Sequence, residues 1–170
     1  MLRDRLLRAH SIRRALAPGE PFDGVVLLDY DARILRRKRL RETSGRDFLV
    51  DLAETVSLED GDAFELEDGR LIRVTAAPEP ILQVTGDLPR LAWHIGNRHT
   101  PCEIQPGRLL IRQDHVLERM LRGLGAVVTP MSGPFRPEGG AYGHGRTMGH
   151  DHGHDHDHGH PHPHGPHDHH

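Results

Sequence analysis

The stretch ILQVTGDLPRLAWHIGNRH, residues 81–99, decides the fold that we predict for the second half of this 170-residue chain. It opens with an apolar run, Ile81 to Val84, that is typical of a buried strand. Apolar residues then recur at the i, i+3, i+4 and i+7 spacing of an amphipathic helix, which Gly96 and Asn97 end. The stretch therefore predicts a strand followed by a short helix. The residues of the helical stripe are Leu88, Leu91, Ala92 and Ile95.

The segments downstream complete this pattern. Short strands are expected near residues 103–104 and at residues 108–112. Asp114 can cap a second helix that Gly125 ends, and residues 126–131 form a last strand. The order βαββαβ predicts a ferredoxin-like sandwich. One face of the second helix is expected to gather the apolar residues Val116, Leu117, Met120, Leu121 and Leu124.

The first half has the pattern of a small all-β domain. Apolar or alternating runs are separated by Gly-Asp turn signals, and Pro78 and Pro80 mark a change of periodicity. We therefore expect an α+β chain in three parts. The predicted strands of the first half are residues 25–30, 47–52, 63–66 and 70–75. The three parts are an N-terminal β domain at 1–76, a ferredoxin-like domain at 77–143 and a disordered histidine-rich tail at 144–170.

A basic run lies within the first half. Six Arg and one Lys crowd residues 33–46, with Glu42 as their single acidic neighbour. Such a run is either a docking face for an acidic partner or nucleic acid, or a solvated edge strand whose charges discourage pairing with other chains. We favour the edge strand, because the run lacks the interleaved aromatic residues of single-strand binders. No nucleic-acid partner is expected.

The tail is a dense array of metal ligands. Eleven of the last 21 residues are His, and they alternate with Asp, Gly and Pro, unlike the unbroken run of a purification tag. Few apolar side chains and three prolines predict disorder. Neutral imidazoles bind borderline divalent ions, so Ni2+, Zn2+ or Cu2+ can bind here and should leave in mild acid. The candidate ligands are His144, His150, His152, His154, His156, His158, His160, His162, His164, His167, His169 and His170.

Composition excludes several classes of protein. The tail carries one Arg and four Asp, a net charge of −3 that equals that of the whole chain, so the body is neutral. A single cysteine, Cys102, excludes a disulfide framework and Cys-rich metal sites. No apolar run approaches the ~20 residues of a membrane span, and Asp4 interrupts the Arg- and Leu-rich start. We expect a cytoplasmic protein that does not interact with membranes.

His99 is the best candidate ligand of the second domain. It follows the Gly96-Asn97 helix stop and should project from a loop, whereas His94 lies on the helix. One histidine cannot hold a metal, but a two-fold interface would bring the same residue from two chains together. A purely structural role for His99 is the alternative. Cys102 could join the site, although a buried small hydrophobe is its more common role.

Three ordered motifs resemble a known family. They are WHIGNRHTP at residues 93–101, DHVLERML at 114–121 and PFRPEGGAYG at 134–143, and RLRET at 39–43 and DGD at 60–62 extend the likeness. Together they resemble the UreE urease accessory proteins, the nickel metallochaperones. The resemblance covers nearly the whole chain, and the histidine tail fits it.

The resemblance implies a homodimer formed through the ferredoxin-like domains, with His99 of each subunit on one interfacial Ni2+ and tail histidines completing the coordination. A peripheral His-x-His site of some members keeps His115 here but has Gln113 at the earlier position. Cys102 also departs from the aliphatic residue that is common there. The β domain is implied to contact urease apoprotein and other accessory proteins, including the maturation GTPase. The chain is then a chaperone for nickel insertion and not an enzyme.

Two other functions compete with this one. A metal-dependent hydrolase could use His99 and His115 as ligands and Glu118 as base, but catalytic zinc takes three protein ligands and Glu118 can pair with Arg122 instead. A nickel or zinc storage protein would use the tail alone. Replacement of His99 separates storage from delivery.

Overall fold

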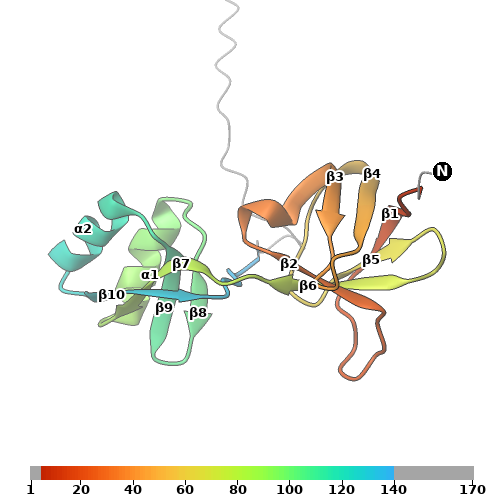
Figure 1. Ribbon diagram of the computed structural model, residues 1–170. Coiled ribbons are helices and arrows are strands. Elements are labelled where there is room, and N and C mark those ends of the chain that lie inside the picture. Colours follow the sequence, from red (N-terminus) through yellow and green to blue (C-terminus); the bar gives the residue numbers. More distant parts are fainter. Residues whose placement is uncertain (1–4, 140–170) are drawn as a thin grey trace, which may run out of the picture.

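The computed structural model describes residues 5–139, and the predicted tail lies outside them. Within the described part, ten strands form two sheets, and two α-helices pack on the second sheet. Figure 1 shows the two sheets in two lobes of the molecule. The expected α+β class is thereby confirmed. Neither helix is long and apolar enough to cross a membrane.

The first lobe is a six-stranded sheet in the order β2-β6-β5-β1-β4-β3. All four predicted strands are present, and β3 lies at the sheet edge as the edge-strand interpretation of the basic run expects. The prediction missed β1, a short strand rich in charged residues that pairs with both β4 and β5. The strands are β1 (Arg8–Arg13), β2 (Gly24–Leu28), β3 (Ile34–Arg41), β4 (Asp47–Ser57), β5 (Ala63–Leu66) and β6 (Leu71–Ala76), with a 3-10 turn at Asp31–Arg33.

A compact apolar core holds this lobe together. Phe48 and Phe64 are essentially fully buried, with ring centroids 5.6 Å apart. Each buried ring stabilises the fold by about 1.5 to 3 kcal/mol relative to an exposed one. A hairpin joins β5 and β6, with Gly69 at φ 87° in its turn. A left-handed residue in a tight turn is why glycine suits this position.

Glu42 is a buried charged residue of the same lobe. Its carboxylate accepts hydrogen bonds from Arg70, at 3.3 Å, and from Ser44, at 3.2 Å. Gly24 makes room for it, because a Cβ added there would lie 2.4 Å from a carboxylate oxygen of Glu42. The motif at residues 39–43 thus has a structural role.

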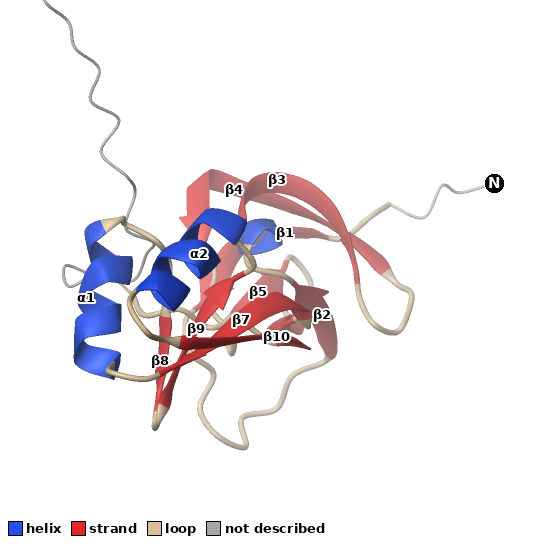
Figure 2. Ribbon diagram, turned by 90° about the vertical axis from the view of Figure 1, so that its left-hand side faces the viewer, coloured by secondary structure: helices blue, strands red, loops and turns tan. Residues whose placement is uncertain are grey.

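The second lobe has the element order βαββαβ and an antiparallel sheet in the order β10-β7-β9-β8. Figure 2 shows α1 and α2 side by side on this sheet. Asp114 caps α2 as predicted, accepting from the N–H groups of Val116 and Leu117. The elements are β7 (Glu79–Thr85), α1 (Leu88–Asn97), β8 (Glu103–Gln105), β9 (Arg108–Arg112), α2 (His115–Gly123) and β10 (Val127–Gly133).

The buried face of α2 differs from the prediction at one residue. Leu117 and Leu121 are buried in the core with Leu91 and Ile95 of α1. Val116 was expected among them but is 65 % exposed. The expectation was wrong because consecutive helical residues are about 100° apart around the axis, so Val116 cannot share the direction of Leu117.

A small third core joins the two lobes. Tyr30 of the first lobe packs edge-on against Phe135, with ring centroids 5.4 Å apart, and Ile81 and Leu110 complete the cluster. Arg33 is 3 % exposed and donates to the carbonyl oxygens of residues 28 and 135. The sequence-based interpretation placed Arg33 in a solvated basic run, which is wrong for this residue, since its guanidinium is enclosed at the junction between the lobes.

The chain passes from the first sheet to the second between Ala76, the last residue of β6, and Glu79, the first residue of β7. The division of the chain into independent domains at residue 77 stays a prediction.

Candidate metal centre

His99 projects from the end of α1. The chain leaves the helix at Arg98, and His99 takes a left-handed backbone conformation with φ 55°. Its N–H donates to the carbonyl of Gly96 at 2.9 Å, which closes the last turn. The side chain is exposed, as the helix stop in the sequence predicted. Histidine is among the few non-glycine residue types enriched in this conformation. His94, in contrast, is half-buried and packs edge-on against Trp93.

A pocket of about 220 Å³ lies beside His99. Three separate stretches of chain meet there: the last turn of α1, the segment that leads into β8 and the last two described residues, Glu138 and Gly139. The chain therefore enters its C-terminal part immediately beside His99. The lining residues are Ala92, Gly96, His99, Thr100, Pro101, Cys102, Ile104, Glu138 and Gly139.

Cys102 lines this pocket, and its thiol is held in the protonated form. Burial, followed by the nearby carboxylates of Glu138 and Glu103, raises the pKa of its thiol to about 11. The thiolate is the form that ligates metals, so a metal ion would have to displace the thiol proton to bind here. The side chain is half-buried and packs against the core of the second lobe, in agreement with the hydrophobic role expected for it.

His115 has different surroundings. It is the first residue of α2, exposed to solvent, and Gln113 two residues earlier is exposed as well. In residues 5–139, no three His, Cys, Asp or Glu side chains lie close enough to hold a metal ion. One described chain therefore does not bring His99 and His115 into a complete site, and both remain predicted ligands. The twelve histidines from His144 to His170 lie outside the described residues.

The hydrolase interpretation also lacks its base. Glu118 pairs with Arg122 across one helical turn, at 3.0 Å, as the sequence spacing predicted. No third ligand accompanies His99 and His115 within the described part of the chain. The geometry does not support metal-dependent hydrolysis.

Large apolar side chains are exposed on α1 and at the pocket. Trp93 on α1 is 63 % exposed, and Ile104, which lines the pocket with His99, is 57 % exposed. Ile104 belongs to β8, an edge strand of its sheet. An apolar surface rimmed by polar residues is typical of a protein interface.

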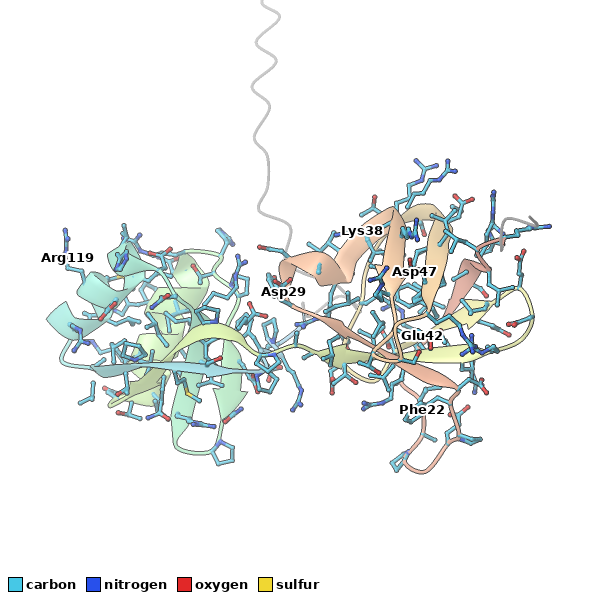
Figure 3. The ribbon with its side chains drawn as sticks, in the orientation of Figure 1. Phe22, Asp29, Lys38, Glu42, Asp47 and Arg119 are labelled. Atoms are coloured by element: carbon cyan, nitrogen blue, oxygen red, sulfur yellow. The ribbon has the colours of Figure 1, made fainter. Side chains whose placement is uncertain are left out.

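Many charges of the basic run are neutralised on the neighbouring strand. Asp47 accepts hydrogen bonds from Arg39 and Arg41, which hold the pKa of its carboxyl well below the usual range. Arg37 lies 3.7 Å from Asp51. Figure 3 shows Lys38 and Asp47 on this lobe, where the paired strands β3 and β4 lie. These pairs fit an edge strand in solvent.

Sequence reasoning gave no role to Glu103 and took Arg33 as one charge among many. Both are buried and hydrogen-bonded to the segment at residues 134–139. Arg33 lies 102 residues from its carbonyl acceptor and Glu103 lies 33 from its donor, so no local pattern could indicate either contact.

Two family models match the chain. One, described as UreE urease accessory protein, N-terminal domain, matches residues 5–77, and the C-terminal domain of the same protein matches residues 70–170.

Individual relatives are similar over most of the chain. The urease accessory protein UreE of Cereibacter sphaeroides is 64% identical over 142 residues, 82% of this chain and 78% of the relative. That of Paracoccus denitrificans is 69% identical over 131 residues, 77% of this chain and 84% of the relative. That of Rhodobacter capsulatus is 69% identical over 126 residues, 74% of this chain and 81% of the relative.

Proposed function

The chain belongs to the UreE urease accessory protein family, and from this membership we propose that it is a nickel chaperone that delivers Ni2+ for assembly of the urease active site. The family gives it a role in urease maturation. Our proposal adds the cargo, the ligands and the absence of catalytic activity. The observation that carries it is the exposed His99 beside a pocket to which the C-terminal end of the described chain also contributes.

The nickel is held between two copies of the chain. One imidazole cannot hold the ion, and a two-fold interface pairs each His99 with its symmetry mate. The exposed Ile104, which lines the His99 pocket, and the exposed Trp93 of α1 support an interface on the second lobe, because they would leave water on dimerisation. The ferredoxin-like assignment of that lobe is supported by its βαββαβ order and by the strand order β10-β7-β9-β8.

Tail histidines complete the coordination. Gly139 lines the His99 pocket, and His144 follows five residues later. Five residues span at most about 17 Å, so a tail imidazole can reach an ion held at His99. Ligands on a long segment can be exchanged one at a time for those of a recipient. Transfer then avoids a single large barrier, a mechanism that an unchanged transfer rate after deletion of residues 144–170 would contradict.

The three parts of the chain divide the work in this proposal. The β domain at 1–76 contacts urease apoprotein and other accessory proteins, including the maturation GTPase. The domain at 77–143 dimerises and binds Ni2+. The tail at 144–170 supplies exchangeable ligands. The protein acts in the cytoplasm, where urease is assembled.

Metal storage is the second candidate, and the histidine count of the tail favours it: eleven of the last 21 residues. Zn2+ and Cu2+ also bind imidazole, with Cu2+ the tighter in the divalent series, so nickel delivery depends on partners and supply.

One experiment separates delivery from storage. Activation of apo-urease is measured with the intact chain, with His99→Ala and with a form lacking residues 144–170, and His115→Ala is the matched control. Delivery predicts that His99→Ala abolishes activation while total nickel capacity stays nearly intact. Storage predicts that only loss of the tail matters.

A further inference from the structure

The segment at residues 134–139, which we call the strap, connects β10 to the edge of the His99 pocket. It has no strand or helix structure, yet three of its six residues are each held by a specific contact. Phe135 is completely buried between the lobes, where its carbonyl accepts from Arg33. The N–H of Arg136 donates to Glu103 at 2.8 Å, and the N–H of Glu138 donates to the carbonyl of Cys102 at 2.9 Å.

Glu103 is the central contact on the side of the metal pocket. It is 8 % exposed, and its two carboxylate oxygens accept from Gln105, at 2.6 Å, and from the strap backbone. A buried carboxylate is costly unless its acceptors are satisfied, so this contact holds the strap in one place. Figure 1 shows β10 running toward the junction between the lobes.

The strap borders two cavities. One is the His99 pocket, and the other, of about 260 Å³, lies between the lobes and is lined by Arg33 and Asp60 of the first lobe. Pro101, Glu138 and Gly139 line both. The side chain of Arg136 also lies 3.3 Å from Asp60. The place where the tail begins is therefore fixed by residues of both lobes.

We propose that Glu103 is a positioning residue for nickel binding: it anchors the strap so that the tail starts beside His99. Arg33 supports it by holding the strap at Phe135. This inference rests on the proposed function and deepens it. Neither residue touches the ion. Each acts by keeping the tether between the pocket and the tail histidines short.

Tether length sets the size of the expected effect. With the strap anchored, His144 lies five positions beyond the last fixed residue, Gly139; with the strap free, it lies eleven positions beyond Gly133. Effective concentration falls roughly as the −3/2 power of tether length, so His144 as a tail ligand loses about threefold. A dimer with one ligand from each tail loses about tenfold in nickel affinity.

The test uses the full chain. Amide hydrogen exchange of residues 136 and 138 in the metal-free protein reports strap release, and calorimetry reports the His99-dependent nickel affinity. Glu103→Ala is expected to speed exchange at both amides and to weaken nickel binding by about threefold to tenfold. Glu103→Gln, whose amide oxygen can still accept from Arg136, should restore both. Arg119→Ala is the matched control, because it removes an exposed charge on α2 that does not line the His99 pocket.

The outcomes separate the two ideas. Faster exchange with unchanged nickel affinity would overturn the positioning role while leaving the chaperone proposal intact. If the unsubstituted chain binds no nickel that His99→Ala removes, the proposed function is contradicted, and the positioning role with it. If Glu103→Ala does not fold, Glu103→Asp keeps the charge, shortens its reach and carries the same expectations.

Discussion

His99 and His115 are both exposed histidines at helix ends of the second lobe, and their surroundings differ. His99 follows α1, lines a pocket, and lies beside the strap through which the chain reaches its tail. His115 begins α2 and does not line this pocket. A histidine becomes a plausible ligand through what the fold brings to it, and exposure alone is not enough.

The largest effect on the difference between the two histidines is expected from removing the anchor of the strap beside His99. Phe135→Ala empties a fully buried site between the lobes and should cost about 3 to 5 kcal/mol of unfolding free energy. Denaturant unfolding measures it. We expect nickel binding at His99 to weaken in the protein that remains folded. A loss below about 1 kcal/mol would show that the strap is not anchored as described.

The elements of the second lobe could be predicted because their signals are local. The apolar stripe of α1 and the Asp114 cap lie within a few residues of the structure that they specify. The exposed position of His99 also followed from a local helix stop. The anchoring of the strap did not, because Arg33 and Glu103 find their partners far away in sequence. Strand β1 escaped prediction for a similar reason, since pairing with β4 and β5 defines it.

The pocket at His99 should also protect its cysteine. With the pKa of Cys102 raised to about 11, alkylation at pH 8 should be roughly a hundredfold slower than for an ordinary thiol. The rate should rise about tenfold per pH unit until pH approaches 11, because only the thiolate reacts. Stopped-flow or mass-spectrometric alkylation of the folded chain measures this. Fast alkylation at pH 8 would mean that the Cys102 thiol is available as a ligand, and Cys102 would then count among the candidate metal ligands of the pocket.

A smaller effect is expected on the His115 side. Asp114→Ala removes the N-cap of α2 and should cost about 1 kcal/mol of stability. Thermal unfolding measures the loss, with Asp114→Asn as a control that keeps a capping oxygen. Nickel binding at His99 should stay unchanged, because α2 does not line its pocket. If Asp114→Ala lowered the nickel affinity as much as His99→Ala does, the His115 side would matter for nickel binding as much as the His99 side.

The most direct test is a nickel titration by calorimetry of the full chain beside a form that ends at Gly143, with light scattering to report the mass of each. His99→Ala and His115→Ala are titrated in both. We predict that the shortened form stays dimeric and keeps one tight nickel per dimer, which His99→Ala removes and His115→Ala leaves in place. If all binding is lost with the tail, or if the two variants behave alike, the chain is a histidine-rich metal buffer and His99 is structural.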